Sequence, residues 1–413
     1  MPDSARKGSL AVIFLTVFVD LLGFGMVIPL LPIYANHFNA TKWELGFLMA
    51  SFSLMQFFFM PLFGRLFDRF GRLPVLLVGL VASIVCYTLF GVATVMKSFA
   101  LLMASRIGAG IAGATISTAQ AYIADCTPPD KRSKGMALIG MAFGMGFTFG
   151  PMLAYFACPA GKGDPGPWPG YVAAILSAGA LGMAIFLLPE SRTPDSQSAA
   201  RRIFDIDAYR IALRTPSVGL LLVAIFVCIF SFANFETTLS MVIKGRSDNF
   251  DAPFEFTWRQ VCLTYAYIGI VLAAIQGGLV RRLAGKFSEG KLAVSGAVIE
   301  IIGFGFVFAT IYTRSLPLLL LAMAIVACGF AFMQPNLNAL LSRRSDPKNQ
   351  GTILGVGQSV SSAGRIVGAA LGIPLLKTQI ELPYVVAAVL MTLGVVLILL
   401  ASARGRDYES TAA

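Results

Sequence analysis

The segment Gly64-Arg65-Leu66-Phe67-Asp68-Arg69-Phe70-Gly71-Arg72 separates two long apolar runs, and a weaker copy of it returns as residues 278–286 with the same spacing of its glycines. A second pair of polar segments, residues 130–135 and 346–351, repeats at nearly the same separation. The chain is therefore predicted to be a duplicated unit of roughly 215 residues. Duplication inside a membrane protein is typical of two bundles that rock about a site between them, which favours a transporter over a receptor or an enzyme.

The composition is that of an integral membrane protein. Hydrophobic residues make up 57% of the chain and charged residues 13%, with a mean hydropathy of +0.77, whereas a soluble domain carries about 25% charged residues. No segment is left that is long enough for a separate catalytic domain, so no enzyme is expected. An intramembrane hydrolase is also disfavoured, because the chain has one histidine and its Gly-x-Gly-Asp sequence, residues 161–164, falls between two predicted spans and not within one.

Apolar runs of about 20 residues predict transmembrane helices. We expect an all-α integral membrane fold with twelve such helices in two pseudo-symmetric six-helix bundles. The bundles are predicted at residues 1–189 and 217–413, joined by a cytoplasmic linker at 190–216 that contains an interfacial helix. The predicted spans are 10–35, 44–63, 74–96, 99–124, 135–157, 170–189, 217–243, 260–280, 291–313, 316–341, 351–375 and 383–403.

The formal charge of +11 is a signal of topology. Most of the 32 Lys and Arg residues fall in segments that would be cytoplasmic if the N-terminus is cytoplasmic, which predicts both termini inside a multi-pass protein of the inner (plasma) membrane. The lipid bilayer is thus the expected partner, nucleic acid is not, and a monomer is predicted. The six cysteines show no metal-ligand spacing and no disulfide framework, so we expect no metal and no cofactor. Cys158 and Cys262 both lie near the predicted outer face and could form a bridge, although packing thiols are favoured.

The spacing Gly-x3-Asp-Arg-x-Gly-Arg resembles the loop signature of the major facilitator superfamily. The resemblance covers nearly the whole chain and is closest to the tetracycline-type drug:proton antiporters, through residues 20–32 in the first helix, Gln56 to Pro61 in the second, Arg106 to Ala114 in the fourth and Gly146 to Pro151 in the fifth. Several positions depart from that pattern and weaken the antiport direction, but not the family: Leu73, Ala109, Ala137, Ala154 and Tyr155.

Ionisable groups at membrane depth are costly and point to function. Asp20 lies about 15 Å along its helix at about 1.5 Å per residue, and by resemblance it is the proton-coupling acid of the first helix, with Arg106 as its expected partner. A fixed structural Asp–Arg pair is the alternative. By resemblance Glu300 occupies the place of a proton-coupling aspartate of tetracycline exporters, but it could also be a neutral packing residue. Glu236 is the counterpart of Asp20 in the repeat, and Arg365 is expected to pair with Glu236 or Glu300.

Polar side chains near a cavity are the candidates for substrate binding. They are Gln56, which by resemblance takes part in substrate recognition, the amide cluster Gln334, Asn336 and Asn338, and Arg365. The candidates for gating follow the loop signature and the Gly-Pro motif of the fifth helix. They are Gly64, Asp68, Arg69, Gly71, Arg72, Asp125, Gly150 and Pro151.

We therefore predict a proton-coupled secondary transporter that exports a small amphipathic or cationic compound by alternating access, with the small molecule and protons as its partners. Proton-coupled movement of a metabolite, a lipid or a siderophore is the alternative within transport. A non-transporting membrane sensor or scaffold is the alternative outside it. The sequence does not name the cargo, because one fold and one set of coupling residues serve many cargoes.

Overall fold

The computed structural model describes residues 3–113, 119, 122–123, 132–159, 165–189, 216–244, 252–283, 286–344 and 350–404. Within these residues the regular structure is helical, and no strand is formed. The chain divides into two compact units, which are described separately below. Unit 1 comprises Met1–Phe204 and Phe256–Gly269, and unit 2 comprises Asp205–Glu255 and Ile270–Ala413.

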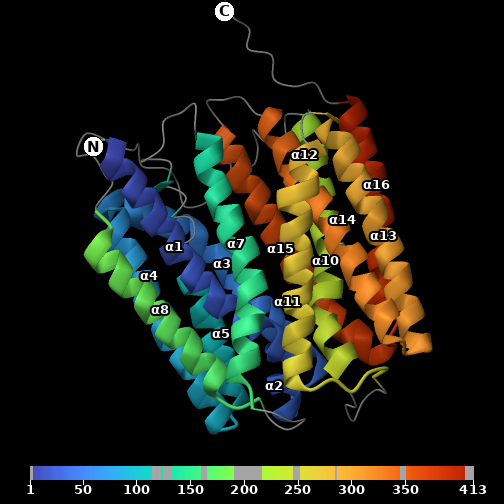
Figure 1. Cartoon of the computed structure of the whole chain (residues 1–413), viewed down its shortest axis with the longest axis horizontal. Helices are drawn as coiled ribbons and strands as arrows, with labels where there is room; N and C mark the ends of the chain where they lie inside the picture. The colour runs from blue at the N-terminus through green and yellow to red at the C-terminus, as the bar shows by residue number, and fades with distance from the viewer. Residues whose placement is uncertain are drawn as a thin grey trace, which may run out of the picture. The chain divides into compact units, whose positions relative to one another are not determined.

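Unit 1 is a bundle of long helices (Figure 1). In it, α1 packs against both α7 and α8, while α5 packs against α3 and α4. The first residues of α11 also belong to this unit, as far as Gly269. The elements are α1 (Asp3–Val27), η1 (Ile28–Leu30), α2 (Leu31–His37), α3 (Lys42–Phe70), α4 (Arg72–Val95), α5 (Phe99–Gly113), α7 (Arg132–Ala157), α8 (Trp168–Leu187) and the start of α11 (Trp258–Ala274).

The first predicted span is helical but not uniform. It is divided into α1, a 3-10 turn at Ile28–Leu30 and α2. Pro29 lies in that turn and Pro32 at the start of α2. A proline has no backbone N–H and its ring collides with the preceding turn, so two of them three residues apart break the regular α-helical hydrogen bonds.

The signature segment 64–72 is not the loop that the apolar runs predict. Helix α3 continues to Phe70 and α4 begins at Arg72, so Gly71 alone links them. Gly71 has φ 101°, a conformation that glycine adopts without a steric penalty. Gly71 thus makes a tight turn, while residues 64–70, which lie between the predicted spans 44–63 and 74–96, are helical and not a loop. Arg65, Leu66 and Arg69 favour this outcome because Arg and Leu have good helix propensity.

Unit 2 is built on two tight helix pairs (Figure 1). Helix α13 packs along α14, α10 packs along α15, and α16 contacts both α10 and α13. The elements are α10 (Pro216–Lys244), η3 (Ile275–Val280), a π-helical turn that continues α11, α12 (Arg281–Leu283), α13 (Glu289–Thr313), α14 (Leu316–Arg343), α15 (Gln350–Thr378) and α16 (Leu382–Arg404).

Each of the twelve predicted spans coincides with a described helix, the fourth one with α5 over its first part only. Within the described ranges, nine helical stretches are long and apolar enough to cross a membrane, and α3 and α5 carry shorter apolar stretches. The predicted domain boundaries stay predictions. The predicted linker and its interfacial helix lie outside the described residues, except for Pro216.

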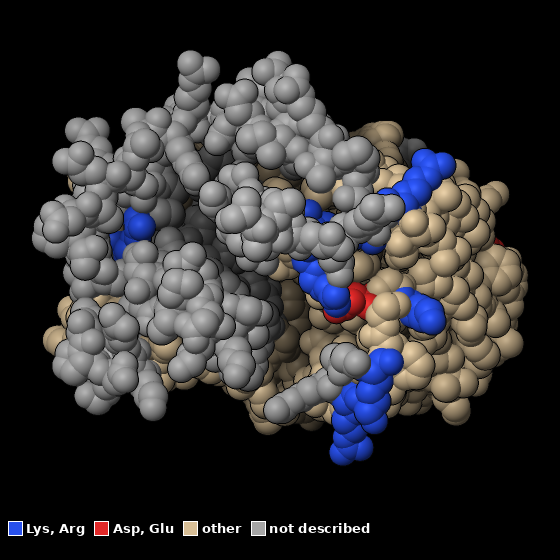
Figure 2. Space-filling model, turned by 90° about the horizontal axis from the view of Figure 1, so that it is seen from above, with Lys and Arg blue, Asp and Glu red and all other residues tan. Residues whose placement is uncertain are grey.

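One end of unit 2 is strongly basic. Figure 2 shows Lys and Arg side chains gathered there around an acidic one. Arg343 Nη1 is 2.6 Å from Glu289 Oε1, which joins the end of α14 to the start of α13. The exposed basic residues at this end are Arg282, Lys286, Lys291, Arg343 and Arg404. Such charge belongs outside the hydrocarbon layer, so the helices of unit 2 have one clearly polar end.

Candidate functional site

Helices α1 and α7 of unit 1 meet through glycines. A Cβ atom on Gly25 would lie 2.4 Å from the Gly146 carbonyl oxygen, and one on Gly150 would lie 2.7 Å from the Gly25 carbonyl carbon. Only glycine permits this approach, because backbone atoms of the partner helix occupy the space that any side chain needs. Gly150 is followed by the buried Pro151 inside α7. The Gly-Pro motif therefore lies at a close helix interface with α1, and its role in gating stays a prediction.

Asp20 lies on α1, shortly before Gly25 in the sequence, and is half-buried. The Ser177 hydroxyl of α8 donates a hydrogen bond to Asp20 Oδ1 at 3.0 Å, and the Ser83 hydroxyl of α4 also bonds to the same carboxyl. Both partners are buried neutral hydroxyls. A hydroxyl can donate to a carboxylate and can accept from a carboxylic acid, so this pocket accommodates Asp20 with or without its proton.

Arg106 on α5 is buried, with 3% of its surface exposed. Its guanidinium lies 4.9 Å from the centre of the Phe52 ring and 5.9 Å from that of Phe24, which is cation–π geometry. Its Nε has no hydrogen-bond partner among the described residues, and no ion pair to Asp20 is formed there. The expected Asp20–Arg106 pair is therefore wrong for this structure. Tyr87 lies within electrostatic reach of both charged groups.

Gln56 on α3 serves as a helix link in this structure. It is 9% exposed, and its Nε2 donates to the carbonyl oxygen of Gly113, the last residue of α5, at 3.2 Å. A Cβ on Gly113 would also press on the Phe52 ring at 2.9 Å. The residue that the resemblance assigns to substrate recognition is thus bonded to protein, and its role in binding remains a prediction.

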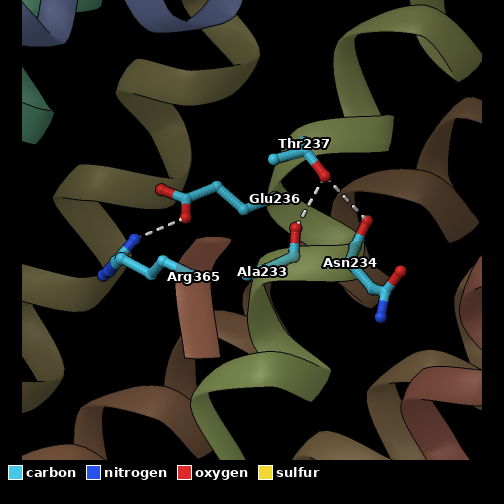
Figure 3. A network of polar contacts seen from close by, with 5 residues as sticks. All are labelled: Ala233, Asn234, Glu236, Thr237 and Arg365. Atoms are coloured by element: carbon cyan, nitrogen blue, oxygen red, sulfur yellow. Dashed lines mark hydrogen bonds and ion pairs between the residues drawn. The ribbon is translucent and has the colours of Figure 1, made fainter. Parts of the chain in front are cut away.

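In unit 2 the corresponding pair is α10 with α15, and here the charges do meet. Arg365 Nη1 lies 2.7 Å from Glu236 Oε2, and Figure 3 shows the two side chains reaching toward each other from α15 and α10. Arg365 is 35% exposed and Glu236 15%. Of the two partners that the sequence leaves open for Arg365, the structure selects Glu236.

The face of α10 beside this ion pair carries further polar side chains. Thr237 Oγ1 donates to the Ala233 carbonyl oxygen at 2.7 Å, so it is satisfied within its own helix (Figure 3). Asn234 is fully buried, and its Oδ1 has no hydrogen-bond partner within the described residues. A Cβ on Gly372 of α15 would lie 3.0 Å from that oxygen. A buried polar atom without a hydrogen-bond partner in the described part of the chain therefore lies at the α10–α15 contact.

Glu300 lies in the interior of unit 2. It has no exposed surface, and neither carboxyl oxygen has a hydrogen-bond partner in the described part of the chain. A Cβ on Gly329 of α14 would lie 2.5 Å from its Cγ, and the Cys228 thiol of α10 lies within electrostatic reach. Moving an unpaired carboxylate from water into such a site costs several kcal/mol. The neutral acid is the form that these surroundings favour.

The three amides of α14 do not form one cluster. Asn336 is buried, and its Nδ2 donates to the Phe332 carbonyl oxygen of its own helix at 2.7 Å. Gln334 is half-buried with an unpartnered Oε1 among the described atoms, and Asn338 is exposed. Residues two apart in a helix point in different directions, so Asn336 faces away from Gln334 and Asn338, which are four residues apart and share one side of the helix.

The predicted gating residues are only partly described. Gly71 and Arg72 form the α3–α4 turn, and Gly150 and Pro151 lie at the α1 contact. Gly64, Asp68 and Arg69 belong to α3, but their side chains lie outside the described part, and Asp125 lies outside the described residues altogether. Within the described ranges no group of three His, Cys, Asp or Glu side chains could hold a metal ion.

Sequence reasoning missed several residues of these sites. Ser177, Ser83 and Tyr87 surround Asp20 and Arg106, and a single sequence gives no sign that they lie beside helices far away in the chain. The glycines of α15 did have a signal, because they recur every fourth residue, the spacing of close helix contacts. They are Gly364, Gly368 and Gly372, and each faces α10.

Comparisons with known proteins agree with this architecture. The sequence model of the Major Facilitator Superfamily matches residues 13–369. The chain is 31% identical to the class C tetracycline resistance protein of Escherichia coli, over 91% of this chain and 90% of that protein. It is 29% identical to the mouse Major facilitator superfamily domain-containing protein 10, over 89% and 86% of the two chains. The crystal structure of the human organic anion transporter MFSD10 (TETRAN) superposes with a TM-score of 0.72 at 25% identity, covering 95% of this chain and 99% of that one.

Proposed function

Because this chain belongs to the Major Facilitator Superfamily and is a membrane transporter rather than an enzyme, we propose that it exchanges protons for a small amphipathic or cationic organic compound, which it exports. Its similarity to a tetracycline resistance protein over nine-tenths of both chains supports a drug-type cargo. In the predicted inner-membrane location with cytoplasmic termini, protons enter the cell down their gradient, and the exchanged compound therefore leaves it. Metabolites, lipids and siderophores are the alternative cargoes.

One observation carries the proton coupling. Two of the carboxyl groups within the spanning helices, Asp20 and Glu300, have no cationic side chain beside them among the described residues. A carboxylate in such a place is penalised by desolvation, and binding a proton removes that penalty. A change of conformation that alters the access of water then alters proton affinity, which is the requirement for coupling proton movement to transport.

The ion pair Glu236–Arg365 supports a division of roles. A carboxylate that is already neutralised by an arginine at 2.7 Å gains little from a proton. We therefore assign proton binding to Asp20 and Glu300, and a fixed structural charge pair to Glu236 and Arg365. Arg106 has no direct contact with Asp20, and Tyr87 is the residue that lies within electrostatic reach of both.

The test is proton-coupled transport by the purified protein in liposomes. An imposed pH gradient should drive accumulation of tetracycline or of a lipophilic dye cation, and adding the compound without a gradient should produce a proton flux in the opposite direction. An ionophore that collapses the gradient should stop accumulation. Accumulation that is indifferent to the ionophore, or compound flux with no proton flux, would contradict proton exchange.

A second candidate function is favoured by Arg106. Its buried guanidinium has no carboxylate partner among the described residues, and its Nε has no hydrogen-bond partner there. A buried cation of this kind is stabilised by an anionic ligand. The similarity to the human organic anion transporter supports a carboxylate-bearing cargo in that case.

The two cargo classes are separated by one pair of binding measurements. Thermal shifts of the wild type are compared with those of Arg106→Lys, which keeps the charge but loses the planar fork of donors. If the cargo is an anion, organic carboxylates stabilise the wild type and lose most of that effect in Arg106→Lys. If it is cationic or neutral, carboxylates have no effect on either protein, and lipophilic cations stabilise both.

A further inference from the structure

Two cysteines of unit 1 meet at the end of α7. Cys158 directly follows the last residue of α7. Its N–H donates to the Ala154 carbonyl oxygen at 2.9 Å, so it continues the hydrogen-bond pattern of the helix. Cys262 lies in the second turn of α11. The Cys158 and Cys262 thiols are within hydrogen-bond distance of each other, and the two residues are 1% and 0% exposed.

The surrounding structure holds these two thiols in place. Thr257 and Gln260 form a reciprocal cap, with Thr257 N–H to Gln260 Oε1 at 2.8 Å and Gln260 N–H to Thr257 Oγ1 at 3.3 Å, and this fixes where α11 begins. Arg259 and Cys262 are three residues apart and so share a face of α11.

Arg259 ties the same face of α11 to the end of α7. Its Nε donates to the Cys158 carbonyl oxygen at 3.3 Å, and its guanidinium lies 5.4 Å from the centre of the Tyr155 ring. Farther from the end of α7, the same two helices meet again, where a Cβ on Gly269 of α11 would lie 2.6 Å from Thr148 Cα of α7. Two close contacts thus set the register of α7 against α11, and the thiols are brought together by that register.

We propose that Cys158 and Cys262 are a redox modification site that closes to a disulfide bond when a disulfide oxidant reaches it. The predicted topology places both at the outer face, where thiols meet an oxidising compartment. One thiolate attacks the oxidant's disulfide, forms a mixed disulfide and releases a thiol. The second thiolate attacks the protein sulfur, closes the bond and releases the second thiol. Two protein thiols are oxidised, one oxidant disulfide is reduced, and two protons pass to the released thiols.

Burial of the pair has two consequences. The oxidant reaches the thiols only when the ends of α7 and α11 separate, so the reaction reports that opening. Once formed, the bond is covered by protein and resists external thiols, as buried sulfurs do. Because α11 continues through η3 into unit 2, the bond would also tether α7 to a helix that enters the other bundle.

The probe is an aromatic disulfide, dithiodipyridine, added to the intact purified protein, followed by alkylation and peptide mapping. We expect a cross-linked peptide pair that contains Cys158 and Cys262, with a mass lower than the reduced pair by two hydrogen atoms. Cys158→Ala and Cys262→Ala should abolish it, whereas Cys328→Ser, a change to a cysteine of α14, should leave it unchanged. Separate pyridyl adducts on the two cysteines, or thiols that stay alkylatable after complete reaction of the protein, would overturn the proposal.

The consequence for transport rests on the proposed function and is measured separately. In liposomes, oxidation should stop transport by the wild type, a strong reductant should restore it, and Cys262→Ala should be insensitive to both. A cross-link that forms without any effect on transport leaves the disulfide site standing and counts against the tether. A protein that transports none of the tested compounds counts against the proposed cargo, and the peptide map still decides the disulfide.

Discussion

The α1–α7 pair of unit 1 and the α10–α15 pair of unit 2 come from the two copies of one repeat, and they handle close packing and charge differently. In unit 1 glycines lie on both helices, and backbone meets backbone at Gly25 and Gly150. In unit 2 the glycines lie on α15 alone and face side chains and backbone of α10. An added Cβ would meet partner backbone at 2.4 Å in the first pair, at Gly25, and at 2.9 Å in the second, at Gly364 and Gly368.

The two units also differ in whether their charged side chains form an ion pair. Glu236 and Arg365 form an ion pair across the unit 2 helices, whereas Asp20 is bonded to a serine and Arg106 lies against aromatic rings. A paired charge is neutralised by its partner, and an unpaired one is neutralised by a proton or a ligand. The α10–α15 pair therefore carries a stabilised ion pair, whereas Asp20 and Arg106 of unit 1 are available for function. The following experiments test that contrast.

The largest effect is expected where backbone meets backbone. Gly25→Ala places a Cβ 2.4 Å from a carbonyl oxygen that cannot move without parting α1 from α7. Overpacking of this kind costs about 1–3 kcal/mol or more, which exceeds the gain in helix propensity of about 1 kcal/mol. We expect a large fall in Tm in detergent, or no folded protein.

Two glycine variants are the controls for that prediction. Gly144→Ala on α7, where nothing lies within 4 Å of the added Cβ, should leave Tm unchanged or raise it. Gly372→Ala in unit 2 meets side-chain atoms at 3.0–3.4 Å and should cost less than Gly25→Ala. If Gly372→Ala proves the more damaging, the contrast in packing between the two pairs is wrong.

The second prediction concerns transport. Asp20→Asn cannot bind or release a proton, so accumulation driven by a pH gradient should fall to the level of empty liposomes, while ligand-induced thermal shifts persist. Glu236→Gln should lower stability and still accumulate the compound in response to the gradient, because we assign it a structural ion pair. Gradient-driven accumulation by Asp20→Asn, or its loss in Glu236→Gln alone with the fold intact, would reverse this assignment of roles.

The third prediction compares two double-mutant cycles of thermal stability. Glu236→Gln with Arg365→Gln should show a coupling free energy of about 1 kcal/mol, modest because such partly exposed pairs are screened by solvent. Asp20→Asn with Arg106→Gln should be additive within about 0.5 kcal/mol, as for residues that share no contact. Strong coupling between Asp20 and Arg106 would mean that they meet in a conformation that the cycle samples and this structure does not show.

The sequence predicted the helices, the duplication and the family well, because each depends on composition and periodicity along the chain. The loop signature and the Gly-Pro motif drew attention to Gly71 and Gly150, which the structure places in a tight turn and at a close helix contact. The interruption of the first span was within reach, since Pro29 and Pro32 are visible in the sequence. The 64–72 segment was misjudged because its charged residues suggested a loop, although arginine, which occurs three times in it, has good helix propensity.

Partner choice was less predictable. Arg106 was expected to find Asp20 because both lie at membrane depth, but depth does not fix the rotation of a helix about its axis. The carboxyl instead faces Ser177, which is 157 residues away in the chain. Arg365 was left with two possible partners for the same reason. Contacts of this kind depend on packing across a whole bundle, which cannot be deduced from one sequence taken alone.

The smallest change in stability is expected for Glu300→Gln. The measurement is informative because a protonated and an ionised carboxyl predict different results. If Glu300 holds a proton in its buried site, Glu300→Gln replaces one neutral group by another of the same shape, and stability should change by no more than about 0.5 kcal/mol. If the carboxyl were ionised there, the amide would relieve an uncompensated buried charge and stabilise the protein by several kcal/mol. A loss above about 1 kcal/mol would instead indicate a hydrogen bond from the carboxyl that the described residues do not provide. Transport by the same variant then separates packing from coupling. If Glu300 only fills space, gradient-driven accumulation stays intact in Glu300→Gln. If Glu300 binds a transported proton, as Asp20 is proposed to do, accumulation falls while stability is unchanged.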